Sequence, residues 1–184
     1  MKKIPTIFER DFDGDPSRVL DKINPHAQWV HDGIGIATRK VDGTCCMVRD
    51  GRLYKRREIK AGKPTPPDFE SCEADTVTGK VMGWLPVTDA PEDHLHREAF
   101  ANHIGLSNGT YELLGPKVQG NPERLTRHEL WAHDSLEIYA DAPRDHAGLK
   151  AWLQGRDIEG LVWHAQDGRM AKIKLSDFGL KRGQ

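Results

Sequence analysis

The sequence contains one lysine in a setting that suggests nucleophilic chemistry. Lys40 follows Arg39 and an apolar-rich segment, residues 34–38, and Asp42-Gly43 comes shortly after it. A lysine attacks an electrophile only when its amine is unprotonated, yet free lysine titrates far above neutral pH. Burial and neighbouring cations lower the pKa of the amine. A Lys-x-Asp-Gly tetrapeptide alone also fits a solvated hairpin turn, because Asp-Gly accepts positive φ.

Two glutamates further along lie in apolar segments that are typical of strands. Glu112 is part of the run TYEL at 110–113, and Glu159 begins the run EGLV at 159–162. A buried carboxylate is costly unless it meets a cation, a hydroxyl group or a metal. Each glutamate is therefore a candidate for a polar site, and the alternative is a buried ion pair that joins strands.

Two lysines close this series of motifs. Lys172 and Lys174 are separated by Ile173, and a strand with its period of two places both lysines on one face. Two ammonium groups on one face of a half-buried strand favour an anion site, where positive charge stabilises phosphate oxygens. The alternative is an exposed face with two solvated lysines.

A basic cluster follows the Lys40 motif. Between Lys55 and Lys63 there are five basic residues and one acid, with Arg56-Arg57 at its start. We expect this cluster to face phosphates, because it directly follows the strand of Lys40, and we assign RNA contacts to Lys55, Lys60 and Lys63. The alternative is a solvated hairpin tip.

The order of these motifs resembles that of the covalent nucleotidyltransferase superfamily of ATP-dependent RNA ligases, DNA ligases and mRNA capping enzymes. The segments KVDGTCC at 40–46 and YELLGPKVQGNPE at 111–123 are most similar to a small RNA ligase family, and the resemblance covers about residues 36–178. It implies that Lys40 takes AMP from ATP and forms a lysyl-AMP intermediate. The AMP would then pass to an RNA 5′-phosphate, which is joined to a 3′-hydroxyl.

The resemblance also implies roles for the other residues. Glu112 would lie at the ribose, Glu159 would contact the nucleophile and a Mg²⁺ (or Mn²⁺) ion, and Lys172 and Lys174 would hold phosphates. The remaining nucleotide-binding candidates are Arg39, Asp42, Gly43, Arg56, Arg57 and Gly160. Counting from the Lys40 motif favours Arg56 over Arg57, and the adenine could stack on Trp84 or Trp131.

Two departures separate the chain from DNA ligases and capping enzymes. The chain ends ten residues beyond Lys174, so we expect no C-terminal OB domain, and Cys45 occupies the position of an arginine that is usual in DNA ligases. Both point to an RNA ligase. A nucleotide-responsive domain without turnover, AMP transfer to another acceptor and a minimal DNA ligase remain as alternatives.

The composition fits one cytoplasmic domain spanning residues 1–184. The chain has 37% hydrophobic and 30% charged residues and a net charge of −1, which argues against general coating of nucleic acid. It contains no apolar run of membrane-spanning length. The three cysteines are an odd number without zinc spacing, as expected for reduced thiols.

The local pattern predicts an α+β fold with mainly antiparallel sheets and flanking helices. The resemblance specifies a nucleotidyltransferase (ligase adenylation, ATP-grasp-like) domain. Expected strands are 4–8, 34–41, 44–49, an edge strand at 83–87, 111–114, 159–163 and 170–175, with a hairpin turn at Asp50-Gly51. Expected helices begin at Asp15-Pro16-Ser17, at His94 and at Asp145. Prolines in 59–76 predict a loop without regular structure.

Overall fold

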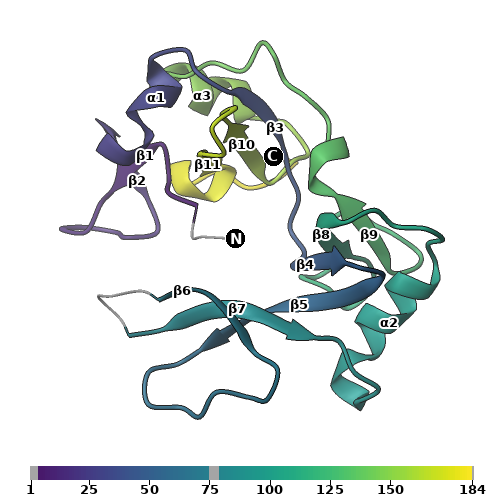
Figure 1. Ribbon diagram of the computed structural model, residues 1–184. Coiled ribbons are helices and arrows are strands. Elements are labelled where there is room, and N and C mark those ends of the chain that lie inside the picture. Colours follow the sequence, from purple (N-terminus) through teal and green to yellow (C-terminus); the bar gives the residue numbers. More distant parts are fainter. Residues whose placement is uncertain (1–3, 75–78, 184) are drawn as a thin grey trace. The chain divides into compact units, whose positions relative to one another are not determined.

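The computed structural model describes residues 4–74 and 79–183, which form two compact units (Figure 1). Residues 42–135 form one unit, here called the central unit. Residues 4–41 and 136–183 form the other, here called the terminal unit. Both combine antiparallel sheets with short helices, so the predicted α+β class is confirmed. Among the described residues, no helix is both long enough and apolar enough to cross a membrane.

The terminal unit is built on a three-stranded antiparallel sheet in the order β11-β10-β3. Strand β3 spans Ile36–Lys40, β10 spans Gly160–His164 and β11 spans Met170–Lys174. A separate two-stranded ribbon joins β1 (Phe8–Arg10) to β2 (Val19–Ile23). The helices are α1 (Gln28–His31) and α3 (His146–Leu153), and Asp145 caps α3 by accepting a hydrogen bond from the backbone N–H of Gly148.

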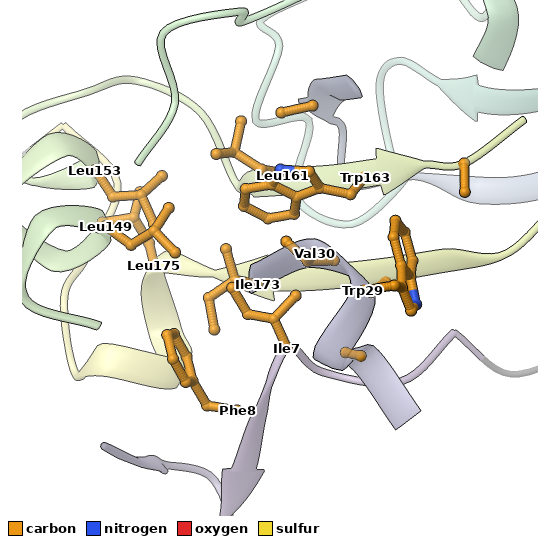
Figure 2. Packing of buried hydrophobic residues seen from close by; sticks show 14 of the residues in the cluster. Ile7, Phe8, Trp29, Val30, Leu149, Leu153, Leu161, Trp163, Ile173 and Leu175 are labelled. Carbon is orange, nitrogen blue, oxygen red and sulfur yellow. The ribbon is translucent and has the colours of Figure 1, made fainter. Parts of the chain in front are cut away.

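One face of this three-stranded sheet forms the core of the terminal unit. Figure 2 shows Leu161, Trp163 and Ile173 packed with side chains from the N-terminal segment and from α1 and α3. All three are fully buried. Side chains alternate between the two faces along each strand. Lys40 and Lys172 are out of phase with the core residues and therefore lie on the opposite face.

The central unit contains a six-stranded antiparallel sheet in the order β6-β7-β5-β4-β8-β9. Its strands are β4 (Thr44–Arg49), β5 (Arg52–Ile59), β6 (Glu70–Ala74), β7 (Val81–Pro86), β8 (Gly109–Leu114) and β9 (Glu129–Ala132). Helix α2 (His94–Ala101) contributes Ala99 and Leu95 to a core with Cys46, Val48 and Leu113 of the sheet, among others. The expected hairpin joins β4 to β5, with positive φ at both Asp50 and Gly51.

The helix expected to begin at Asp15-Pro16-Ser17 is wrong. Residues 19–23 are strand β2, in which Val19 pairs with Arg10 and Ile23 with Phe8. Leu20 and Ile23 remain 41% and 38% exposed in this strand, whereas Val19 packs against the core of the terminal unit. Cross-strand pairing therefore outweighs the local helical spacing.

Two expectations for the central sheet also need correction. Strand β6 lies within residues 59–76, the segment expected to form a loop without regular structure. A strand is possible there because the last proline of the segment, Pro67, comes before β6. Strand β7 pairs with both β5 and β6, so it is an interior strand rather than the predicted edge strand.

Gly160 is required by the close approach of two strands. A Cβ atom at this position would lie 2.1 Å from the carbonyl oxygen of Ile173 and 2.8 Å from the Cα of Lys174. We expect Gly160→Ala to lower the free energy of unfolding by about 1–3 kcal/mol, because the β10–β11 pair must separate to admit the methyl group. Gly109→Ala is the matched control, since a Cβ there meets only a ring atom of Tyr111 at 3.9 Å. Chemical denaturation of both variants tests this, and equal stability would contradict it.

Candidate active site

Strand register brings the three candidate lysines of the terminal unit onto one sheet face. Gly160 in β10 pairs with Lys40 on one side and with Lys174 on the other, and Val162 pairs with Lys172. The period-two placement of Lys172 and Lys174 predicted from the sequence is confirmed. Because Gly160 has no side chain, nothing from β10 separates Lys40 from Lys174 at the sheet surface.

Glu159 joins two of these lysines. Its Oε2 accepts a hydrogen bond from Lys40 Nζ at 2.5 Å, and its Oε1 lies 3.1 Å from Lys174 Nζ. The Glu159 side chain is 13% exposed, so the carboxylate is mostly withdrawn from water and compensated by two ammonium groups. Lys40 Nζ also donates to its neighbour's carbonyl, Val41 O, at 3.3 Å.

Lys172 is largely buried beside other positive charges. Burial, as the larger cause, and the charges of Lys40 and Lys174 together lower its pKa to about 8. The position explains the burial, because Lys172 pairs with Val162 on one side and with Thr6 of the N-terminal segment on the other. The carboxylates of Asp177 and Glu159 oppose this shift.

Asp177 was not recognised in the sequence. It is 2% exposed, and its carboxylate accepts a hydrogen bond from the backbone N–H of Lys174 at 2.8 Å and one from Arg10 at 2.9 Å. It follows the end of β11 by three residues, which is the spacing of a helix-capping acid, and this was the available signal. Its role is to hold the end of the strand that carries Lys174.

Arg39 lies apart from the lysine face. It pairs with Leu161, which in turn pairs with Ile173, so its side chain belongs to the core-facing side of the sheet. The charge of Arg39 acts on the pKa of Tyr139 instead. Arg39 is therefore not part of the nucleotide site that we propose.

In the central unit, the Glu112 carboxylate has two defined partners. Its Oε1 accepts a hydrogen bond from the backbone N–H of Gly43 at 3.1 Å, and its Oε2 lies 3.0 Å from His133 Nε2. A Cβ at Gly43 would lie 2.3 Å from the carbonyl oxygen of Leu113, so only glycine allows this approach. Asp42 directly precedes this glycine at the start of the central unit.

Strand alternation distinguishes the two arginines of the doublet. Lys55 pairs with Cys46, whereas Cys45 pairs with Glu112, so the next residue, Arg56, lies on the Glu112 face and Arg57 on the other. Arg56 is half-buried and pairs with Trp84, which is 6% exposed. Trp131 pairs with Glu112 and is half-buried. The choice of Arg56, and the stacking role of either tryptophan, stay predictions.

The basic residues assigned to RNA have different surroundings. Lys60 and Lys63 are exposed in the loop after β5, as is Arg57 at the end of that strand. Lys55 instead forms an ion pair with Asp93, a carboxylate that is 1% exposed and also accepts hydrogen bonds from Thr88. No sequence pattern signalled this pair, which gives Lys55 a structural role in the central unit.

Comparison with known proteins identifies the family. The family model for RNA ligase 1 matches residues 92–184, half of the chain. The chain belongs to the RNA ligase 1 family. RNA ligase 1 from Danio rerio is 24% identical, over 98% of this chain and 81% of the relative. RNA ligase 1 from Rattus norvegicus is 23% identical, over 97% of this chain and 81% of the relative. The part matched by the RNA ligase 1 model includes Glu112, Glu159, Lys172 and Lys174, and Lys40 precedes it.

The lowered pKa of Lys172 predicts a stability change with pH. The protonated lysine opposes folding fully below about pH 8, and the opposition fades between pH 8 and the unfolded value of 10.5. We expect Lys172→Met to stabilise the protein at neutral pH, by at most about 3 kcal/mol. This advantage should shrink as the pH rises towards 10, and urea denaturation at both pH values measures it.

Lys174→Met is the matched control, because Lys174 pairs with Glu159 and its removal leaves that carboxylate with one cation fewer. We expect this variant to be less stable than the wild type at neutral pH. Stabilisation by both variants, or a Lys172→Met advantage that grows with pH, would contradict the account.

Proposed function

We propose that the protein is an ATP-dependent RNA ligase in which Lys40 carries AMP. The observation that carries this proposal is the Glu159 carboxylate held between Lys40 and Lys174, with Lys172 on the same sheet face. Membership of the RNA ligase 1 family supports a ligase. The proposal includes a fold of the nucleotidyltransferase (ligase adenylation) type. It also includes that residues 1–184 act as one functional domain.

In the first step, Lys40 Nζ attacks the α-phosphorus of ATP. A nitrogen–phosphorus bond forms, the bond from the α-phosphorus to the bridging oxygen of pyrophosphate breaks, and pyrophosphate leaves. Before the attack, the Lys40 ammonium gives up a proton to Glu159, which already accepts a hydrogen bond from Nζ, and the amine loses a second proton to solvent as the nitrogen–phosphorus bond forms. Lys174 and the protonated form of Lys172 stabilise the negative charge of the reacting phosphates.

Two further transfers complete ligation. The RNA 5′-phosphate oxygen attacks the phosphorus of lysyl-AMP, which restores the lysine amine and gives an RNA capped by AMP through a 5′–5′ pyrophosphate. The 3′-hydroxyl of the second RNA end then attacks the RNA phosphorus and releases AMP. A cytoplasmic location is also part of this proposal.

The central unit contributes the nucleoside contacts in this proposal. Glu112 contacts the ribose, and Arg56 on the same sheet face contacts the ribose or a phosphate, for which a planar guanidinium is well suited. Gly43 supports Glu112 through its backbone N–H. Arg57, Lys60 and Lys63 contact the RNA backbone, because their exposed side chains are accessible to phosphate.

Glu159 would hold Mg²⁺ or Mn²⁺ together with the nucleotide phosphates. Magnesium commonly binds through one or two carboxylates, substrate phosphates and several waters, so a single glutamate fits it. In the parts of the chain that the structure describes, no group of three or more His, Cys, Asp or Glu side chains could form a metal site from protein ligands alone. The ion would neutralise phosphate charge, and Lys40 and Lys174 already share the glutamate that would hold it.

We expect the protein to gain the mass of AMP after incubation with ATP and magnesium, and Lys40→Arg to abolish the gain. Arginine keeps the positive charge beside Glu159 but remains protonated, so it cannot act as a nucleophile. Intact-mass analysis measures the adduct. Lys22→Arg is the control, because Lys22 pairs with Glu9 on the exposed β1–β2 ribbon and should leave labelling unchanged. A Lys40→Arg protein that still gains AMP would rule out Lys40 as the nucleophile.

We expect the adenylylated protein to join 5′-phosphorylated RNA ends and to act poorly on all-DNA ends. Reversing Arg57 and Lys60 to glutamate should weaken RNA joining by about tenfold or more and leave lysine adenylylation near the wild-type rate. Each lost phosphate contact weakens RNA binding and reduces its salt dependence. Gel analysis of labelled RNA measures joining, and Lys150→Glu, at an exposed position of α3, is the control for the effect of one charge reversal elsewhere on the protein.

Two outcomes would contradict the RNA assignment. Equal or better sealing of nicked duplex DNA would favour a minimal DNA ligase. Lysine adenylylation with no sealing of any polynucleotide would favour AMP transfer to a different acceptor.

A further inference from the structure

His133 is placed against Glu112 by the register of the central sheet. Tyr111 in β8 pairs with Ala132 in β9, so the next residues, Thr110 and His133, are neighbours at the end of the strand pair. The 3₁₀ turn His133–Ser135 begins there. His133 is 22% exposed and Glu112 is 13% exposed, so water competes weakly for their contact.

Both ring nitrogens of His133 are engaged. Nε2 lies 3.0 Å from Glu112 Oε2, and Nδ1 lies 2.9 Å from the hydroxyl oxygen of Thr110. An ionised carboxylate can only accept, so Nε2 must donate to Glu112. In the neutral ring Nδ1 is then an acceptor, and the Thr110 hydroxyl donates to it. Thr110 therefore selects the ring tautomer that serves Glu112.

The opposite oxygen of Glu112 is fixed by a different segment. Oε1 accepts the backbone N–H of Gly43, three residues after Lys40 in the sequence. His133 and Gly43 thus each fix one oxygen, and together they leave the carboxylate plane little freedom to rotate. A carboxylate fixed in this way presents its remaining lone pairs to a ligand in one orientation.

We propose that His133 is a positioning residue, which orients Glu112 for the nucleoside of ATP, with Thr110 setting its tautomer. This inference rests on the proposed function, because it takes Glu112 as the ribose contact. His133 acts through Glu112 and takes no part in the bond-forming step. Its loss therefore weakens ATP binding and leaves the chemistry at Lys40 largely intact.

The test compares substitutions that keep one contact each. In His133→Gln, the side-chain amide nitrogen reaches the position of Nε2 and still donates to Glu112. In His133→Asn, the shorter amide reaches only the position of Nδ1, beside Thr110. Lysine adenylylation is measured over a range of ATP concentrations, and thermal melting of each variant reports its stability. His94→Gln is the control, because the exposed His94 lies outside the proposed site and its Nδ1 contacts the carbonyl oxygen of Pro91.

We expect His133→Asn and His133→Ala to raise the apparent KM for ATP by about tenfold, the usual effect of losing one hydrogen bond to a charged group. The maximal rate should change much less. His133→Gln should stay near the wild-type KM. Thr110→Val should raise KM by a smaller factor, because it removes the donor that sets the tautomer, and Thr110→Ser should restore it.

The outcomes separate this inference from the proposed function. A wild type that adenylylates Lys40 while His133→Ala keeps the wild-type KM overturns the positioning role alone. Equal loss in His133→Gln and His133→Ala also overturns it, because the Nε2 contact would not be what matters. If His133→Ala fails to fold, the inference is tested by comparing the KM for ATP of Thr110→Val and Thr110→Ser. A wild-type KM in Thr110→Val overturns the inference. A wild type without any adenylylation overturns both.

Discussion

The contact of one carboxylate with two lysines organises the candidate active site of the terminal unit. Glu159 lies directly before β10 and reaches Lys40 on one neighbouring strand and Lys174 on the other. Breaking such a pair in a poorly solvated place is costly, because the remaining charges lose their compensation. Gly160 permits the arrangement, since its position between the two lysines leaves no room for a side chain. Three motifs that are separated in the sequence thus contribute their charged residues to one cluster.

This cluster is not electrically balanced. Lys40, Lys172 and Lys174 oppose the single charge of Glu159, with Asp177 engaged by Arg10 and the backbone of Lys174. The lowered pKa of Lys172 is the measurable consequence of burial beside like charges. A fold selected for stability alone would not keep a third lysine there, and an anionic ligand would remove the conflict. A local cost in stability of this kind is typical of ligand sites, which supports the phosphate-binding role that we propose for these lysines.

The central unit separates two polar groups by the alternation of its strands. Glu112 and His133 lie on one face, whereas Lys55 lies on the face of Cys46 and Leu53 and is neutralised by Asp93. Each carboxylate has partners that satisfy its oxygens, as burial requires. Consecutive residues of β5 lie on opposite faces of the sheet, so Lys55 and Arg56 have different surroundings.

The sequence by itself determined the features that depend on neighbours in the chain. The period of two placed Lys172 and Lys174 on one face, Asp50-Gly51 specified the β4–β5 hairpin, and Asp145 began α3, all as observed. The residues of the lysine cluster could be named because motif order and residue type carry that information. Only the tertiary structure decided which groups meet. It turned 19–23 into a strand through pairing with β1, directed Arg39 to the core face and gave Lys55 and His133 their carboxylate partners. These contacts join residues far apart in sequence, and the free energy that selects them comes from burial and long-range pairing, which no local pattern encodes.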